Sequence, residues 1–464
     1  MKILALMIQD QIGDNVNNRI CFYDSLDKEL TEMGHDVLWL NLIQFYYISD
    51  NRSKKEWINS WINKVKKFQP DIIFTFNNQI SEEIIKVTNC PIILFEADLS
   101  EFFANTDLIK KYKDRYYAAT FFEQGKKQYI SLGFRDDRII PLHPATSVKR
   151  ENKPKIHNIS FIGSSFWVDN EYVKKQFLPF ERHSFYQMFR KFWESNDYDY
   201  EKLVNRYLGK NKLSVFDHYL IFDSRSYILQ SVLDLGLKLY GVYWDKSVSQ
   251  QLLPLVCAFD KTPMYSLQHN QDVYNSSKVN LSISHPQCRG YAHPWRIYDI
   301  MASGGALVSS FSEALADRTK GYVDIPMYHS PYDVRDLCKK LLKDTPFRQE
   351  VISASNEFIE KFGRWIDNFK TIQEYTGVKI AEPSNGEGSA SIEYDLITEF
   401  NTNSPTVSRA KNIKARYKSF LYGILYAISN LPGIHSLQSE KYRKKIYNAL
   451  VKYNKLLHKK GTNP

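Results

Sequence analysis

The chain has 464 residues, of which 43% are hydrophobic and 25% are charged, as is typical of globular proteins with two or three domains. Its formal net charge of +10 is unevenly placed, because the segment from Arg409 to Lys460 holds 13 Lys or Arg and a single acid, Glu440. The rest of the chain is therefore slightly acidic. A nucleic-acid partner is not expected, because the basic residues belong to one tail.

The cysteines are five in number and scattered, with no CxxC pair and no Cys/His cluster: Cys21, Cys90, Cys257, Cys288 and Cys338. Neither a disulfide framework nor a metal site is expected, and a reducing cytoplasm fits best. The first ten residues, MKILALMIQD, form a short apolar run that ends in Gln and Asp. This pattern predicts a strand and not a signal peptide. No apolar run reaches 18 residues, so no membrane span is expected.

The N-terminal part, residues 1–148, alternates strand and helix signals. The expected strands are short apolar runs: Lys2–Ile8, His35–Leu42, Asp71–Asn77, Pro91–Asp98, Ala118–Glu123 and Arg138–Leu142. Strands separated by helices form parallel βαβ units, so the class is α/β with a doubly wound sheet. No G-x-G-x-x-G follows the first strand, so a dinucleotide cofactor is not expected.

A second α/β domain is expected over residues 149–380, after a polar, basic linker at 146–157. Its expected strands are Ile159–Ile162, Lys238–Trp244, Lys278–Ser284, Ala306–Val308 and Asp324–Met327, and a helical insertion is expected at about 170–235. Residues 381–408 contain Pro, Ser, Gly and five acids without Lys or Arg, which predicts an acidic, partly flexible linker.

The tail, residues 409–464, is basic and contains two helical pieces. One is the apolar run Phe420–Ile428, and the other has apolar residues at helical spacing from Tyr442 to Leu457. A basic amphipathic pair of helices can lie on an anionic bilayer, so we expect membrane-surface contact through 409–460 at the inner face of the cytoplasmic membrane. Docking on the rest of the chain and dimerisation are alternatives, and the oligomeric state is not predicted.

The stretch His293–Ser310, HPWRIYDIMASGGALVSS, predicts a loop, a short helix, a two-glycine turn and a buried strand. Arg296 lies at the expected start of the helix, where a cation and free N–H groups suit a phosphate. Asp299 follows one turn later, where a carboxylate suits a sugar hydroxyl. The alternative is a surface Arg–Asp pair at i, i+3.

Four pieces of the second domain follow one another in order: NISFIGSSF (Asn158–Phe166), LKLYGVYWDKSV (Leu237–Val248), VYNSSKVNLSIS (Val273–Ser284) and RGYAHPWRIYDIMASGGALVSS (Arg289–Ser310). They resemble the glycosyltransferase group-1-like domain of the CgeB-like family, which has the GT-B fold of two Rossmann-like domains facing a cleft. The resemblance covers about residues 115–376. It implies a glycosyltransferase that moves a sugar from a nucleotide sugar to a glycan, a lipid-linked acceptor or a surface-polymer precursor, without a metal or cofactor.

The stretch Arg289–Ser310 resembles the family's Arg-x-x-Glu-x-x-Ala-x-Gly-Gly signature, with two departures. The family usually has Glu where this chain has Asp299, and in related retaining enzymes that Glu is the second of a Glu-x7-Glu pair. The first Glu of the pair would fall at Tyr291. The retaining motif is therefore incomplete, and the resemblance does not assign the stereochemistry.

The donor-binding residues implied by the resemblance are Gly163, Ser164, Lys278, Arg289, His293, Arg296, Asp299, Gly304 and Gly305. Arg296 is expected to bind the diphosphate and Asp299 the ribose. Lys278 and Arg289 are candidates to assist, with surface cations as the alternative. His293 is expected to touch a phosphate or the sugar, or to be structural.

Backbone contacts are expected at two glycine turns. Gly163 and Ser164 form a turn where the backbone can approach the donor. Gly304 and Gly305 are expected chiefly to set the helix–strand turn, with donor contact as a secondary role.

The acceptor side is expected on loops at the carboxyl ends of the N-terminal strands. The titratable candidates there are Asp10, Asp14, Glu96, Asp98, Glu123 and His143. Asp98 is the first choice as the catalytic base of an inverting reaction, and a helix cap is its alternative role. A nucleotide-sugar epimerase and a degenerate transferase that acts as a scaffold or glycan-binding subunit are the alternative functions.

Overall fold

The computed structural model describes residues 1–7, 19–41, 51–98, 100, 103–122, 125–166, 213–242, 244, 253–262, 264, 266–285, 288, 292–384, 386 and 388–393. Both sheets belong to one unit, Met1–Leu396, and Ile397–Pro464 forms another. The predicted tail and most of the predicted helical insertion lie outside the described residues.

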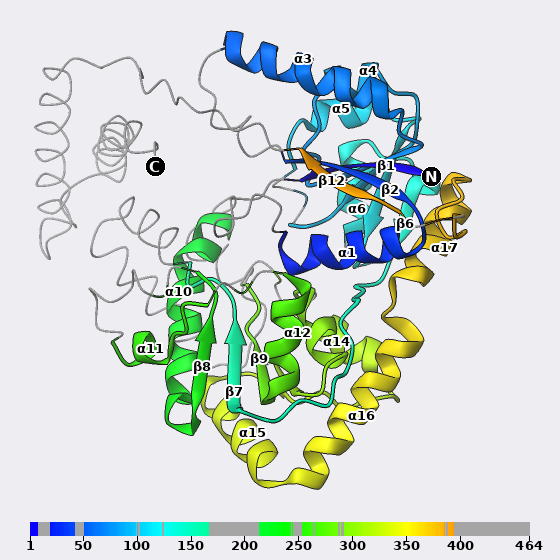
Figure 1. The fold of residues 1–464 in the computed structure, drawn as a ribbon. Helices are drawn as coiled ribbons and strands as arrows, with labels where there is room; N and C mark the ends of the chain where they lie inside the picture. The colour runs from blue at the N-terminus through cyan, green and yellow to red at the C-terminus, as the bar shows by residue number, and fades with distance from the viewer. Residues whose placement is uncertain are drawn as a thin grey trace, which may run out of the picture. The chain divides into compact units, whose positions relative to one another are not determined.

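The first sheet has seven strands in the order β12-β2-β1-β3-β4-β5-β6 (Figure 1). Every neighbouring pair is parallel. The strands are β1 (Lys2–Met7), β2 (Asp36–Asn41), β3 (Ile72–Phe76), β4 (Ile92–Phe95), β5 (Tyr116–Thr120), β6 (Ile139–Pro141) and β12 (Ala390–Glu393). The runs IIFTF and IILF are wholly buried, as expected for parallel strands covered on both faces. The six strands predicted for this half are confirmed.

The helices of this half are α1 (Cys21–Glu32), α3 (Asn51–Phe68), α4 (Glu82–Lys86), α5 (Thr106–Lys111) and α6 (Lys126–Leu132). Its core joins side chains of β1, β3 and β4 to Leu26 and Leu30 of α1.

The second sheet has five parallel strands in the order β11-β10-β9-β7-β8. They are β7 (His157–Ile162), β8 (Leu237–Tyr240), β9 (Ser277–Ser282), β10 (Ala306–Ser310) and β11 (Met327–Tyr328). The helices around it are α10 (Leu213–Ser231), α11 (Leu253–Ala258), α12 (Leu267–Ser276), α13 (Arg296–Met301), α14 (Glu313–Thr319), α15 (Pro331–Lys343) and α16 (Thr345–Phe362). The predicted α/β class and four of the strands predicted here are confirmed, and the short helix expected after Trp295 is α13. The fifth strand, expected at Asp324–Met327, begins only at Met327.

The end of the described chain returns to the first sheet. Helix α17 (Trp365–Thr376) places Trp365, Phe369 and Ile372 in the core of that sheet. Strand β12 then pairs with β2 along its edge, as Figure 1 shows in orange. The sequence predicts a linker from residue 381 and does not predict this strand.

The segment that joins the two sheets is firmly held. Thr146, Ser147 and Val148 are completely buried. Arg364 donates from Nη1 to the carbonyls of Thr146 and Val148 at 2.9 and 2.8 Å. Ser147 Oγ lies 3.0 Å from Ser25 Oγ of α1. The polar sequence after residue 145 therefore forms an anchored crossing.

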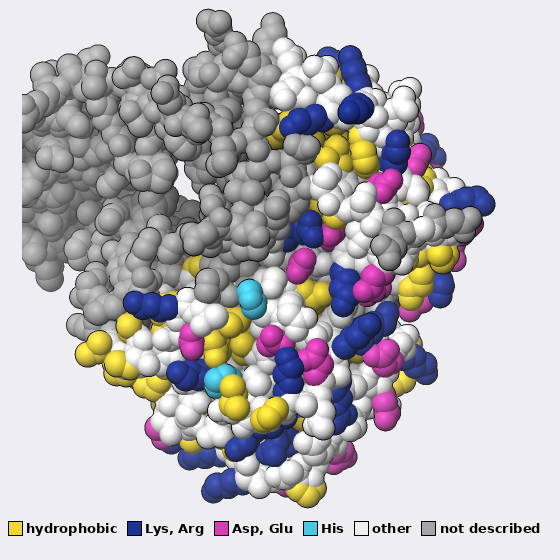
Figure 2. All heavy atoms as spheres, in the orientation of Figure 1, with side chains coloured by type: hydrophobic (Ala, Val, Ile, Leu, Met, Phe, Trp, Pro, Cys, Tyr) yellow, Lys and Arg dark blue, Asp and Glu magenta, His cyan; other side chains and the backbone are white. Residues whose placement is uncertain are grey.

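On the face drawn in Figure 2, basic and acidic side chains of the described residues are interspersed. Within the described ranges, no helix combines the length and apolar character needed to cross a membrane.

Candidate functional site

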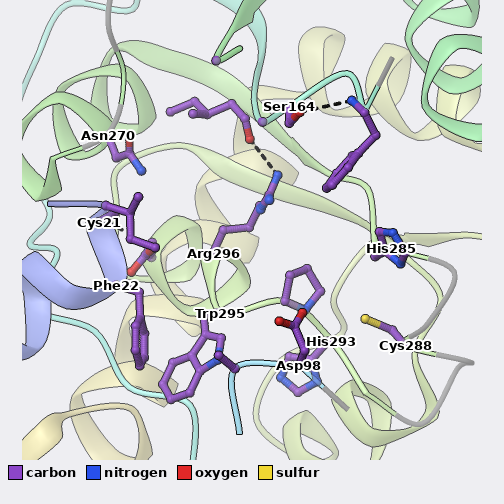
Figure 3. Close-up of a pocket in the computed structure, with 18 of the residues that line it drawn as sticks. Cys21, Phe22, Asp98, Ser164, Asn270, His285, Cys288, His293, Trp295 and Arg296 are labelled. Carbon is purple, nitrogen blue, oxygen red and sulfur yellow. Dashed lines mark hydrogen bonds between the residues drawn. The ribbon is translucent and has the colours of Figure 1, made fainter. Parts of the chain in front are cut away.

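A cavity of about 450 Å³ is lined by residues from both halves of the unit (Figure 3). The first half contributes the start of α1 and the residues after β4. The second half contributes the ends of β7 and β8, parts of α10 and α12, the residues His285 and Cys288, and the start of α13 with the residues before it. In open parallel sheets, ligands bind beyond the carboxyl ends of the strands. The cavity is therefore where the fold would place a substrate.

The turn after β7 forms one wall. Gly163 donates its N–H to the Tyr240 carbonyl at 3.0 Å, and its own carbonyl accepts from Trp244 Nε1 at 2.8 Å. Gly241, after β8, has φ +117°, and a Cβ there would lie 2.3 Å from the Gly163 oxygen. Only glycine at 241 allows the two strand ends to approach this closely.

Arg296 lines the cavity at the first residue of α13. Its Nη1 donates to the carbonyl of Ile162 at 2.7 Å, the contact marked in Figure 3. Its guanidinium lies 5.7 Å from the ring centroid of Phe161. The side chain is half-buried, so it is fixed by the end of β7 and remains at the cavity wall.

Arg225 of α10 is a second cation in this wall. It is 2% exposed, and its Nη1 donates to the carbonyl of Ser164. Its guanidinium lies 4.6 Å from the ring centroid of Phe166, and its Nε has no hydrogen-bond partner. The two arginines thus hold the carbonyls that precede and follow Gly163.

Neither guanidinium forms an ion pair with an acid among the described residues. Burial, and next the positive charge of Arg296, lower the pKa of Arg225. Two cations that repel each other in one wall destabilise it, because neither is held in an ion pair with an acid among the described residues. An anion bound between them would relieve this repulsion.

Asp299 also lines the cavity, at 7% exposure. Thr146 Oγ1 donates to its Oδ1 at 2.5 Å, and the Cys21 thiol donates to its Oδ2 at 3.6 Å. Burial raises the pKa of Asp299 to about 6, although these two hydrogen bonds and the charge of Arg296 act in the opposite direction. Asp299 therefore joins α13 to α1 and to the buried crossing segment.

His293 is 3% exposed and lines the cavity, and neither ring nitrogen has a hydrogen-bond partner. Its ring stacks on Tyr298 at 5.9 Å and meets the edge of Phe122 at 5.3 Å. Burial, and then the charge of Arg318, lower the pKa of His293 to about 3. The imidazole is therefore neutral at physiological pH.

Two carboxyl groups line the cavity after β4. Asp98 Oδ2 accepts from Asn77 Nδ2 at 2.7 Å. The Oδ1 of Asn77 accepts from the N–H groups of Ala97 and Asp98, so this side chain fixes the loop. Glu96 has a buried Oε2 without a hydrogen-bond partner. Burial raises the pKa of Glu96 to about 7.

Of the predicted donor-binding residues, five line the cavity: Gly163, Ser164, His293, Arg296 and Asp299. Lys278 is not among the lining residues. It lies at the amino end of β9, where its Nζ donates to Asn158 Oδ1 at 2.9 Å. Arg289 lies outside the described residues, as does Tyr291.

The glycines of the second turn are also at the amino end of a strand, β10, and are not among the lining residues. Gly304 donates its N–H to Asn275 Oδ1 at 2.8 Å. A Cβ on Gly305 would lie 2.1 Å from Asn280 Nδ2. Gly304 and Gly305 therefore set the helix–strand turn, which is the main role predicted for them.

Of the other acceptor-side candidates, Asp10, Asp14 and Glu123 lie outside the described residues. His143 is not among the lining residues, and its backbone N–H and carbonyl are paired with the side chain of Asn368.

Sequence reasoning missed two cavity residues, Arg225 and Asn270. Asn270 of α12 is 7% exposed, and its Oδ1 is unpartnered. The only signal for Arg225 is a single cation within the largely apolar helix LSVFDHYLIFDSRSYILQS. No local signal marks Asn270. Among the described residues, no group of three or more His, Cys, Asp or Glu could hold a metal ion.

A family model described as glycosyl transferase-like matches residues 225–374, which include Arg225, His293, Arg296 and Asp299. A sequence search of curated proteins returned no match.

The chain is also similar to several solved structures. These include HepE of Anabaena in complex with UDP and glucose, at 10% identity over 81% of this chain and 98% of that chain, with a TM-score of 0.42. The BGT enzyme of T4 phage with UDP-glucose matches at 11% identity over 83% and 100%, with a TM-score of 0.43. Sucrose-phosphate synthase from Thermosynechococcus elongatus matches at 10% identity over 81% and 97%, with a TM-score of 0.47.

These TM-scores lie below 0.5, so the assignment depends on the family match and on the two sheets themselves. The match falls within the region where the sequence resembles group-1-like glycosyltransferases, and that prediction is confirmed. Residues 225–374 therefore form a glycosyl transferase-like domain, in a chain built on two parallel α/β sheets.

Proposed function

We propose that this glycosyltransferase takes its sugar from a nucleotide-sugar donor and that the donor diphosphate binds at Arg296 and Arg225. The observation that carries the proposal is this pair of arginines at the carbonyls on either side of Gly163, without an acidic partner among the described residues. Arginine is suited to phosphate because its planar guanidinium donates two parallel hydrogen bonds.

The same pair suits the chemistry of transfer. When the bond between the sugar and the diphosphate breaks, negative charge develops on the leaving phosphate oxygen. Fixed cations in a cavity with little water stabilise that charge without having to reorganise. The proposed reaction therefore needs no metal ion, and its donor is a substrate and not a resident cofactor.

Asp299 is the proposed contact for the ribose. A carboxylate offers about four lone-pair positions, of which Thr146 and Cys21 use two. The remaining positions can accept hydrogen bonds from two ribose hydroxyls. Asp299 would then hold the nucleotide and the junction between the two halves at once.

His293 is proposed to bond a hydroxyl of the transferred sugar. A neutral imidazole carries one donor and one acceptor nitrogen, and both are unpartnered here. A neutral ring adds no charge that would favour a phosphate. This choice separates the two roles that the sequence leaves open for His293.

The acceptor is proposed to enter from the side of Glu96 and Asp98 and to offer a hydroxyl group of a glycan, a lipid-linked saccharide or a surface-polymer precursor. Asp98 is the residue that the sequence predicts as the base, and it lies in the cavity wall.

Arg296→Ala tests the donor site. Loss of a charge-assisted contact should weaken nucleoside diphosphate binding by about 1.5–3 kcal/mol. Calorimetry with UDP, GDP and dTDP, and with their sugars, measures this change. Arg335→Ala is the matched control, because Arg335 is paired with Asp234 and does not line the cavity. Wild-type affinity in Arg296→Ala would exclude the proposed role.

The tail at 409–460 is proposed to bring the enzyme to the inner face of the cytoplasmic membrane, where lipid-linked acceptors assemble. Its 13 basic residues support this proposal, since each Lys or Arg near an anionic surface contributes about 1 kcal/mol. The full chain should sediment with phosphatidylserine vesicles at low salt, and a chain that ends at residue 408 should not. Equal sedimentation of both chains would contradict membrane binding through the tail.

A further inference from the structure

The two carboxyl groups after β4 differ in their surroundings. Asp98 is held by Asn77, whose amide already occupies one carboxylate oxygen at 2.7 Å. Glu96 lines the same cavity, but its buried Oε2 has no hydrogen-bond partner. A buried carboxyl oxygen without a partner is costly, so a group that enters the cavity and donates a proton would stabilise it.

We propose that Glu96 is the catalytic base, which accepts the proton of the acceptor hydroxyl as that oxygen attacks the donor sugar. This inference rests on the proposed function, because it requires a donor held at Arg296. It replaces Asp98, the residue that the sequence predicts, with its neighbour two positions earlier.

The proposed step moves one proton and exchanges one bond at the anomeric carbon. The acceptor O–H bond breaks and its proton passes to the carboxylate of Glu96. The acceptor oxygen forms a bond to the anomeric carbon, and the bond from that carbon to the diphosphate oxygen breaks. The electron pair leaves with the nucleoside diphosphate, which the Arg225 and Arg296 guanidiniums stabilise. One direct displacement inverts the anomeric configuration.

The groups around Glu96 support a base that works near neutral pH. Burial raises the pKa of Glu96 to about 7, and the negative charge of Asp98 acts in the same direction. The Tyr129 side chain of α6 and the Phe121 backbone act on the pKa of Glu96 in the opposite direction. Arg318 also meets this backbone, because its Nη2 donates to the Phe121 carbonyl. A carboxylate with such a pKa can both accept a proton and release it at neutral pH.

The experiment measures transfer to water, because the acceptor is not identified. The probe is whichever sugar of UDP, GDP, CMP or dTDP stabilises the full chain in a thermal-shift panel, and release of the free nucleotide is followed from pH 5 to 9. We expect kcat/KM to rise about tenfold per pH unit below about pH 7 and to level off above it, because Glu96 must be ionised to accept a proton.

Three variants decide between the carboxyl groups. Glu96→Gln should lower kcat by about 10²- to 10⁴-fold with nucleotide affinity unchanged, as expected for loss of a general base. Glu96→Asp keeps a carboxylate on a side chain that is one methylene shorter. It should therefore retain more activity than Glu96→Gln. Asp98→Asn should retain the rise in activity near pH 7.

The proposal is overturned if Glu96→Gln retains its turnover, if Asp98→Asn alone removes the pH dependence, or if NMR shows that the sugar is released with the donor's anomeric configuration. Failure of the proposed function looks different. In that case, the wild-type chain would bind no nucleotide and would hydrolyse none of the nucleotide sugars.

Discussion

Asp299 accepts two hydrogen bonds at the cavity wall, one from the Thr146 hydroxyl and one from the Cys21 thiol. These contacts come from the crossing segment and from the first residue of α1, at sequence separations of 153 and 278 residues. A single carboxyl therefore contributes both to the proposed nucleotide site and to the joint between the two sheets.

Asp299→Asn should change how stability depends on pH. The pKa of Asp299 is raised to about 6 in the folded chain, above the value of about 3.9 in the unfolded chain. The folded chain therefore keeps a proton that the unfolded chain gives up, and stability falls as the pH rises from about 4 to about 6. Two pKa units correspond to a loss of at most about 3 kcal/mol.

Urea unfolding at pH 4 and pH 6.5 measures this effect. The wild-type chain should lose more stability over this interval than Asp299→Asn, whose amide does not ionise. An identical pH dependence in the two chains would show that Asp299 does not carry the raised pKa.

At the scale of elements, the wall of the cavity depends on the close approach of the two turns that follow β7 and β8. Gly163 and Gly241 occupy these two ends, and the carbonyls that flank Gly163 orient the two arginines. A displacement of this turn would move both cations, although neither arginine is in β7 or β8.

Gly241→Ala should destabilise the chain and weaken nucleotide binding. Alanine is strained at φ +117°, and its Cβ would also overlap the Gly163 carbonyl oxygen. The matched control is Gly377→Ala, at φ +71° with no atom within 4 Å of the added Cβ. The control should lose about 1–2 kcal/mol through strain alone.

The overlap should cost Gly241→Ala about 1–3 kcal/mol more than the control. Thermal unfolding and calorimetry with nucleotide measure the two effects. Equal losses in both variants would show that the close approach of the two turns is unimportant.

The sequence predicts strands correctly where burial on both faces produces a continuous run of hydrophobic residues. The runs IIFTF in β3 and IILF in β4 are continuously buried and almost wholly apolar, because helices cover both faces of the sheet. Strand β12, ASIE, is short, and its first two residues are exposed on the edge beside β2. Its existence depends on a partner about 350 residues earlier, which no local pattern records.

Residues of the candidate site could be predicted from the sequence where they share one motif. Arg296 and Asp299 share one helical turn in a recognisable signature, and the structure places both at the cavity. Arg225 comes from α10, and its role depends on the carbonyl of Ser164, 61 residues away. Glu96 and Asp98 both end the same strand, and only their tertiary surroundings distinguish them.

At the scale of the whole molecule, the first sheet is completed by two distant parts of the chain. Residues 1–148 supply six of its strands, and residues 365–393 supply α17 and β12. The two parts meet where Asn368 Nδ2 donates to the His143 carbonyl at 2.7 Å. The first half of the unit is therefore discontinuous in sequence.

Residues 1–148 alone should not unfold cooperatively, because they lack Trp365, Phe369 and Ile372 of the core. A chain in which a short Gly/Ser linker joins Val148 to Gly363, ending at residue 396, is the matched control and should unfold cooperatively. Circular dichroism during urea unfolding compares the two. Equal cooperativity would show that α17 and β12 are dispensable.

The return of α17 and β12 has a consequence for protein synthesis. A ribosome makes the chain from its N-terminus, so β12 is made only after all the strands of the second sheet. The second sheet comes from one uninterrupted stretch, β7 to β11, and is complete in sequence before the first. During translation the second sheet can thus form first. Until α17 and β12 have been made, the N-terminal strands leave the edge of β2 unpaired and part of their core exposed.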